Sequence, residues 1–263
     1  MQGSPANVNV LRWQTGDYVA EFANRTLRPV EVVILTRYRD ALAGRVLEVG
    51  CGAGRILGYL LALGGEVHGI DVSPRMVDYC RRRYPNASVV LGDMTQPPAA
   101  LDGRFDVIFA SFNVADVLDD AARRALFADV HRRLAPGGLF IFSSHNLAFI
   151  EAGGSRANLR HKLAALNPRV RQLLVLPQRL ISSLRNRRRL APLQRYEADH
   201  AILNDQALDF ALLHYYIRPG DQRRALDELG YDLVEGLDLE GNTIASGQTA
   251  SHSPEIHYVA RRR

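Results

Sequence analysis

Apolar residues follow two different periods along the first half of the chain. Four short runs rich in β-branched and aromatic residues are followed by small or acidic residues: RVLEVG (45–50), EVHGIDVS (66–73), SVVLGD (88–93) and FDVIFAS (105–111). Between them, apolar residues recur at helical spacing, as in GRILGYLLALG (54–64). Short buried strands that alternate with helices are typical of a parallel sheet covered on both faces, so we expect an α/β fold.

The remaining elements extend this pattern at both ends. Before the first strand, residues 14–43 predict two helices. After the fourth strand, the pattern predicts eight further segments. In order, these are a helix from Asp119–Asp120 to Leu134, the strand LFIFSSHN (139–146), an insertion, the strands EADHAIL (197–203) and ALDFALLHYYI (207–217), a helix over 219–230, and the strands YDLVEGLDL (231–239) and EIHYVARR (255–262).

The insertion, residues 147–195, has a different composition. Eleven basic residues and one acid lie between positions 151 and 195, so the rest of a chain of net charge +5 is acidic. Apolar residues recur there at helical spacing, which predicts amphipathic helices: Val170, Leu173, Leu174, Leu180, Ile181 and Leu184. The arginine run at 187–189 is interpreted as a solvated helix face, and contact with an anionic ligand is the alternative.

Composition limits the class of protein. The 263 residues contain no apolar run of about 18 residues and no amino-terminal signal pattern, so we expect a cytoplasmic protein without a membrane partner. Cys51 and Cys80 are the only cysteines, too few for a disulfide framework. Only one of the 33 basic residues is a lysine, a bias that need not reflect function.

A glycine-rich turn after the first strand predicts a ligand-binding loop. Gly50, Gly52 and Gly54 form G-x-G-x-G, and Arg55 stands where a dinucleotide fingerprint has its third glycine. Glu48, two residues before the first glycine, would repel a pyrophosphate but suits a ligand with a cationic group. Acids also end the next two strands: Asp71 could accept hydrogen bonds from a ribose, and Asp93 with Met94 could hold an adenine.

These motifs resemble those of the class I S-adenosylmethionine-dependent methyltransferases. VLEVGCGAGR, GIDVS, LGDM and RRLAPGGLFIFSS stand in the family's order over about residues 40–146. The resemblance implies a Rossmann-like, doubly wound, mostly parallel seven-stranded sheet whose last strand is antiparallel. It implies S-adenosyl-L-methionine as cofactor, held by Glu48, Gly50, Cys51, Gly52, Asp71, Val72, Asp93, Met94 and Ser111.

Candidate catalytic residues follow the fourth and fifth strands. His145 directly follows FIFSS and is the best candidate for a general base, although a lone histidine more often has a structural role. Asn113 lies where cofactor and acceptor would meet, and Tyr216 is a second candidate beside His214. Methyl transfer from a sulfonium needs no metal, and none is expected.

We therefore expect a single domain that methylates a small-molecule acceptor at oxygen, nitrogen or carbon. Its parts would be amino-terminal helices acting as a lid (1–43), the cofactor core (44–146), the basic cap (147–195) and the rest of the sheet (196–263). Alternatives are an RNA or protein acceptor, a nicotinamide-dependent oxidoreductase, and a non-catalytic protein that binds the cofactor. SFNVADVL (111–118) lacks the N/D-P-P-Y/F signature of many nucleic-acid amino methyltransferases, which makes a nucleic-acid acceptor less favoured. The sequence does not indicate an oligomeric state.

Overall fold

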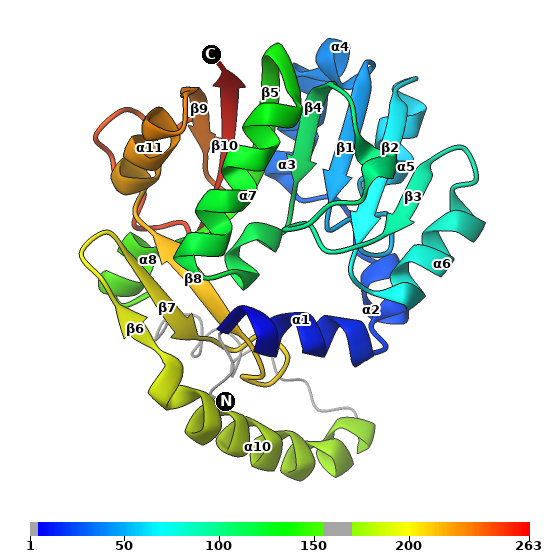
Figure 1. The fold of residues 1–263 in the computed structure, drawn as a ribbon. Coiled ribbons are helices and arrows are strands. Elements are labelled where there is room, and N and C mark those ends of the chain that lie inside the picture. The colour runs from blue at the N-terminus through cyan, green and yellow to red at the C-terminus, as the bar shows by residue number, and fades with distance from the viewer. Residues whose placement is uncertain (1–4, 155–169) are drawn as a thin grey trace.

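The computed structural model describes residues 5–154 and 170–263, and a mixed sheet lies at its centre (Figure 1). Its first five strands are mutually parallel and lie in the order β3-β2-β1-β4-β5. They are β1 (Arg45–Val49), β2 (Glu66–Asp71), β3 (Ser88–Leu91), β4 (Phe105–Ala110) and β5 (Leu134–Asn146). The strand order reverses between β1 and β4, so their carboxyl ends border a crevice where ligands of such sheets bind.

Two further strands complete a seven-stranded core. β10 (Glu255–Arg262) runs antiparallel to β5, and β9 (Tyr231–Leu237) runs antiparallel to β10. The predicted antiparallel last strand is therefore confirmed, as are the α/β class and the doubly wound, mostly parallel sheet.

The sheet has ten strands rather than the seven that were expected. The additional strands are β6 (Arg195–Tyr196), β7 (His200–Asn204) and β8 (Leu213–Ile217), which form an antiparallel ribbon. β8 pairs in parallel with the last two residues of β5, His145 and Asn146, beyond the end of β4. The chain pattern had predicted two of these strands, but not that they join the central sheet.

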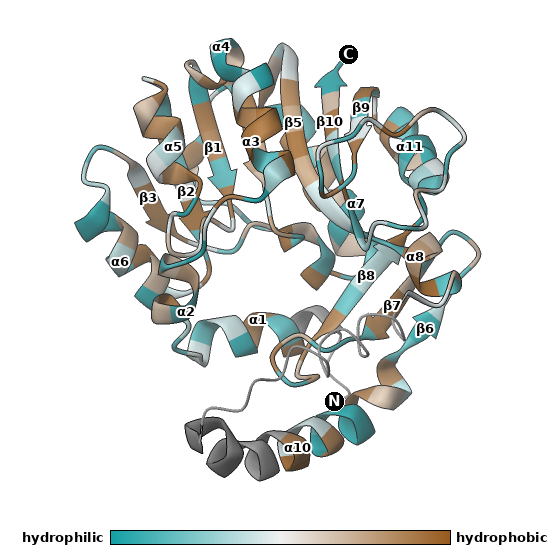
Figure 2. Ribbon diagram, turned by 180° about the vertical axis from the view of Figure 1, so that it is seen from behind, coloured by the Kyte–Doolittle hydropathy of each residue, from teal (hydrophilic) through white to brown (hydrophobic). Residues whose placement is uncertain are grey.

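Helices cover both faces of the sheet because successive strand residues point to opposite sides. Val46 packs with α3, α4, α5 and α6, whereas Leu47 belongs to the core under α7 and α11. The central strands carry mostly apolar residues (Figure 2). The helices are α1 (Pro5–Thr15), α2 (Val19–Ala23), α3 (Pro29–Arg37), α4 (Arg39–Leu42), α5 (Leu57–Ala62), α6 (Pro74–Arg83), α7 (Asp120–Arg133), α8 (Leu147–Glu151), α10 (Val170–Leu190) and α11 (Pro219–Glu228).

Local sequence explains several helix starts. Ser73 is the N-cap residue of α6 and Pro74 opens it, where its missing N–H costs no hydrogen bond. Asp119 caps α7 by accepting a 3.0 Å hydrogen bond from the Ala122 N–H. Helix α7 begins where the sequence predicts, at the Asp119–Asp120 pair.

The amino-terminal prediction is wrong in number and in starting point. Four helices replace the expected two, and the first begins at Pro5 instead of near residue 14. Its start contains β-branched residues, which are poor helix formers, and tertiary contacts determine its position. The buried Asn9 amide donates to the carbonyls of Val117 (2.7 Å) and Leu213 (2.6 Å), which ties α1 to the rest of the protein.

The insertion contains α8 and the 21-residue α10, and its middle, residues 155–169, lies outside the described residues. Among the helices of residues 5–154 and 170–263, none is long and apolar enough to cross a bilayer.

Candidate active site

A cavity of about 360 Å³ opens at the carboxyl ends of β1, β2, β3 and β4. All nine residues expected to bind the cofactor line this cavity: Glu48, Gly50, Cys51, Gly52, Asp71, Val72, Asp93, Met94 and Ser111. Two of the three catalytic candidates, Asn113 and His145, line it as well. The structure therefore brings residues that are nearly 100 positions apart in the sequence to one cavity.

The glycine loop depends on backbone conformations that side chains disfavour. Gly50 (φ +64°) and Gly52 (φ +53°) lie in the left-handed region, and a Cβ on Gly50 would lie 2.1 Å from Val114. Asp71 fixes the loop with both of its carboxylate oxygens. Oδ2 accepts a hydrogen bond from the Gly52 N–H and Oδ1 accepts one from the Ser73 N–H, each at 2.8 Å. Burial raises the pKa of Asp71, although these N–H groups stabilise its charged form.

Glu48 is buried below this loop, with only 2% of its surface exposed. Its Oε2 atom has no hydrogen-bond partner among the described residues. Burial raises the pKa of Glu48 well above its usual value, and the nearby Arg55 guanidinium counters only part of that shift. An unpartnered carboxylate oxygen at a cavity wall is suited to a cationic or hydrogen-bond-donating ligand group.

Arg55 itself has a structural contact that the sequence did not reveal. Its guanidinium forms a buried ion pair with both carboxylate oxygens of Glu31 on α3, one of them at 2.7 Å. The pair packs the glycine loop against α3.

The chain between β4 and α7 is strained where it borders the cavity. Phe112 (φ +60°) and Asn113 (φ +58°) are non-glycine residues in the left-handed region, a conformation that costs energy and often occurs at functional sites. The Phe112 ring lies against the guanidinium groups of Arg28 (4.3 Å) and Arg25 (4.7 Å). These arginines line the cavity, so this wall is both aromatic and cationic.

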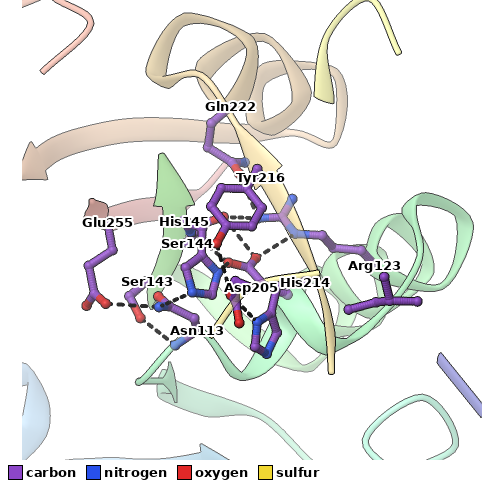
Figure 3. A network of polar contacts seen from close by, with 12 residues as sticks. Asn113, Arg123, Ser143, Ser144, His145, Asp205, His214, Tyr216, Gln222 and Glu255 are labelled. Carbon is purple, nitrogen blue, oxygen red and sulfur yellow. Dashed lines mark hydrogen bonds and ion pairs between the residues drawn. The ribbon is translucent and has the colours of Figure 1, made fainter. Parts of the chain in front are cut away.

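His145 belongs to a network of polar contacts at the other end of the cavity (Figure 3). Asp116 Oδ2 accepts hydrogen bonds from the His145 backbone N–H (2.7 Å) and from its Nδ1 (2.8 Å). With Asp116 ionised, Nδ1 carries the ring proton, and Nε2 presents a lone pair to Asn113 Nδ2 at 3.2 Å. The Asn113 amide also donates to Glu255 Oε2 at 2.9 Å, while its own Oδ1 has no partner among the described residues.

Charges around His145 make its ring more basic. Burial alone would lower the pKa of His145, but the hydrogen bond and charge of Asp116, helped by Asp205 and Glu255, raise it. Asp116 is fully buried and is held by the Ser144 hydroxyl (2.9 Å) and by the Arg123 guanidinium (3.4 Å). The ring orientation is thus fixed from behind, through groups that do not contact the cavity.

Comparison with known proteins agrees with this geometry. The profile of a methyltransferase-domain family matches residues 46–138. The magnesium-protoporphyrin O-methyltransferase of Rhodobacter capsulatus is 32% identical over 109 residues, which are 38% of this chain and 47% of that protein. The CcbJ methyltransferase of Streptomyces caelestis shares the fold over 97% of this chain and 98% of its own (TM-score 0.60, 20% identity). The glycopeptide N-methyltransferase MtfA, solved with S-adenosylmethionine, does so over 91% and 96% (TM-score 0.56, 19% identity).

This chain therefore contains a segment, residues 46–138, that is similar to the methyltransferase-domain family, and it shares its fold with solved methyltransferases. It spans about half the length of the curated relatives that it matches in sequence, and identities near 20% with the solved structures establish the fold. The matched segment ends at residue 138, so His145, His214 and Glu255 lie outside it, whereas Asn113 and Asp116 lie within it.

Tyr216, the third catalytic candidate, does not line the cavity. Its hydroxyl donates to Asp205 (2.9 Å), and its ring packs 4.7 Å from the ring of His145. His214, which does line the cavity, shares the same Asp205 oxygen at 2.6 Å. His145, Asp205 and His214 have potential ligand atoms within 4.8 Å of one another, but 2.6 Å is a hydrogen-bond distance, shorter than the roughly 3 Å or more between two ligands of one ion.

Sequence reasoning missed three charged residues of this network: Arg123, Asp205 and Glu255. Glu255 begins the last strand and lies opposite His145 in the β5–β10 register, where it pairs with Arg28. The available signal was an acid at the first position of the last predicted strand, EIHYVARR. Arg123 and Asp205 gave none, because an arginine on a helix and an aspartate in a turn are ordinary in sequence.

Proposed function

We propose that this protein transfers a methyl group from S-adenosyl-L-methionine to an oxygen, nitrogen or carbon atom of a small-molecule acceptor. The observation that carries the proposal is that one cavity joins all nine expected cofactor residues to the Asn113–His145 pair. A relative named for a small-molecule acceptor, the magnesium-protoporphyrin O-methyltransferase, supports the acceptor class.

In the proposed complex, the methionine part of the cofactor lies on Gly50, Cys51 and Gly52. The ammonium group of that methionine part would donate a hydrogen bond to the unpartnered oxygen of Glu48. Beyond it, Asp71 and Val72 hold the ribose, Asp93 and Met94 hold the adenine, and Ser111 lies beside the sulfonium. The sequence of contacts follows the order of the strand ends along the cavity.

Methyl transfer requires alignment and, for a protonated nucleophile, a base. S-adenosyl-L-methionine held by these residues would supply a methyl group already activated on a sulfonium, and S-adenosylhomocysteine would be the product that leaves. The acceptor proton passes to Nε2 of the neutral His145 ring, whose single proton lies on Nδ1, where it is donated to Asp116. The acceptor replaces Asn113 as hydrogen-bond donor to Nε2, whose present bond of 3.2 Å is long.

Two segments would cover the bound molecules. Val10, Trp13 and Phe22 of α1 and α2 line the cavity and suit the lid expected for residues 1–43. The cap expected for residues 147–195 contacts the cavity wall indirectly. Asn186 on α10 donates a 3.0 Å hydrogen bond to the carbonyl of Asp209, and the preceding residue, Leu208, lines the cavity.

Two rival functions would use the same cofactor but would not methylate a small molecule. An RNA or protein acceptor would use the exposed arginines at 187–189, and a non-catalytic protein would bind the cofactor without turnover. The strained, cavity-facing Asn113 and the buried Asp116–His145 pair favour a reaction over mere binding.

Calorimetric titration with S-adenosylmethionine, S-adenosylhomocysteine and NAD tests the cofactor. We expect the first two to bind and NAD not to bind. Asp71→Ala should weaken binding by about 1–3 kcal/mol or more, because the ribose and the glycine loop both lose an acceptor. Asp40→Ala, at a 95% exposed side chain, is the matched control. Binding of NAD alone, or equal losses in both variants, would refute the proposal.

Release of S-adenosylhomocysteine over a panel of hydroxyl, amine and carbon-acid acceptors then tests turnover. Cofactor binding without release on any member of the panel, but with methylation of RNA or protein, would move the function to the first rival. Binding without any transfer would leave the non-catalytic one.

A further inference from the structure

Helix α10 exposes apolar side chains that a buried helix would cover. Leu180, Ile181 and Leu184 are 58%, 66% and 55% exposed. Their spacing places them along one side of the helix, over slightly more than one turn. α10 lies apart from the central sheet, beyond the β6–β8 ribbon (Figure 1).

Charge along the same helix has a single sign. The 21 residues of α10 include six arginines and no acidic residue. Arg185, Arg188 and Arg189 are exposed around the carboxyl-terminal turns, next to the apolar residues. Aliphatic residues on one side of a helix, flanked by arginines, are the composition of helices that lie in the headgroup region of a bilayer.

The other side of α10 holds the helix to the protein. Leu190 is buried in a cluster with Ile202, Leu213 and Tyr215 of the β7–β8 ribbon. The exposed apolar residues therefore face away from a fixed attachment point.

Other partners fit this surface less well. A stable protein interface buries about 800 Å² on each side in a complementary patch, more than three side chains on a convex helix provide. Single-stranded RNA is bound through aromatic platforms, and residues 180–190 contain no aromatic residue.

We propose that α10 docks on an anionic lipid surface, with Leu180, Ile181 and Leu184 inserted among the lipids and Arg185, Arg188 and Arg189 against the phosphates. The proposal does not depend on the proposed reaction. It departs from the expectation of no membrane partner, because that expectation considered only a spanning segment.

Docking would also bring the cavity close to the bilayer. The turn that contacts α10 holds three successive residues in the left-handed region, Leu208, Asp209 and Phe210. Arg187 lies 4.8 Å over the Phe210 ring, and Leu208 lines the cavity. A docked α10 thus contacts one wall of the cavity through this turn, an arrangement suited to an acceptor that partitions into lipid.

Co-sedimentation of the full chain with vesicles tests the proposal. The vesicles are phosphatidylcholine alone, or phosphatidylcholine with about one third phosphatidylglycerol, at low and high salt. We expect binding to the anionic vesicles that weakens with salt. Replacing Arg185, Arg188 and Arg189 by Gln should lower the partition coefficient about 100-fold, at about 5-fold for each arginine. Replacing Leu180, Ile181 and Leu184 by Gln should lower it at least about 10-fold.

A second arginine run provides the matched control. Replacing Arg81, Arg82 and Arg83 on α6 by Gln changes the net charge equally and should leave vesicle binding intact. Circular dichroism of each variant checks that the fold persists. Three results would each overturn the proposal: no sedimentation of the wild type, equal loss in the α6 control, or full binding by the variant without Leu180, Ile181 and Leu184. The last of these, with tighter binding of single-stranded RNA, would assign the arginines to nucleic acid instead.

Discussion

The half of the cavity proposed to hold the cofactor (the cofactor half) and the half proposed to hold the acceptor (the acceptor half) are built in different ways. The cofactor half is formed by strand ends and the glycine loop within residues 46–138, the segment matched by the methyltransferase family. The acceptor half is formed by side chains that are distant in sequence, among them Asn113, His145, His214 and Glu255. In the first half the backbone sets the shape, and in the second hydrogen bonds between side chains do so.

The two halves should differ in how much substitution they tolerate. A loop that depends on left-handed glycines tolerates little change, because any side chain at Gly50 would collide with Val114. The acceptor network can change one side chain at a time. The two halves should therefore be separable by mutation, with effects on turnover from one and on cofactor affinity from the other.

The largest effect is expected at the acceptor half. His145→Ala should lower turnover by about 10²-fold or more while cofactor affinity stays unchanged, because only proton removal is lost. S-adenosylhomocysteine release, measured with an acceptor found in the panel, checks turnover, and calorimetry checks affinity. His252→Ala, at a 67% exposed histidine, is the control. If turnover survives in His145→Ala, the base lies elsewhere or none is needed.

The cofactor half could largely be predicted from the sequence, whereas the acceptor half could not. Strand ends and the glycine loop are local features, so Glu48, Asp71 and Asp93 could be placed at one sheet edge from strand order alone. The acceptor half depends on β8 joining β5 and on β10 setting Glu255 opposite His145. No local sequence pattern indicates such long-range strand pairing. The expected position of Tyr216 at the cavity was therefore wrong, because its hydroxyl is turned toward Asp205.

The next largest effect is expected at the cofactor half. Glu48→Gln removes the charge that would face the ammonium group and should weaken S-adenosylmethionine binding about 10- to 100-fold, the range of a charge-assisted hydrogen bond. Turnover at saturating cofactor should change far less. Calorimetry measures the affinity, with the exposed Glu240→Gln as control. Unchanged affinity would mean that the free oxygen of Glu48 does not contact the cofactor.

A smaller effect, with a distinctive pH dependence, is expected for Asp116→Asn. The backbone N–H of His145 keeps an oxygen next to Nδ1, so the ring tautomer persists and turnover should fall only about 10-fold. The pKa of His145 is raised by Asp116 in the wild type, so removing that charge lowers it. His145 then stays neutral to lower pH, and the acidic limb of the rate profile should move to lower pH.

Rate profiles of the wild type and of Asp116→Asn measure this shift. Thermal unfolding must accompany them, because Arg123 loses its buried partner, and such a loss can cost about 3–5 kcal/mol. A purely structural role of Asp116 would lower the unfolding temperature without moving the acidic limb, and that result would remove Asp116 from the proton path.

The smallest effect is expected at α1. Trp13 is the only tryptophan, lines the cavity, and packs edge-on against Tyr18 (5.2 Å) and Phe22 (5.6 Å). If α1 closes over the cofactor, S-adenosylmethionine should change the emission of Trp13 in a saturable way, at the concentrations that calorimetry gives. Trp13→Phe keeps an aromatic ring and should weaken binding about 3- to 10-fold, the range of one aromatic contact. Emission that does not respond to the cofactor would show that α1 belongs to the acceptor half or to neither, because its anchor at Asn9 already holds it to Val117 and β8 without ligand.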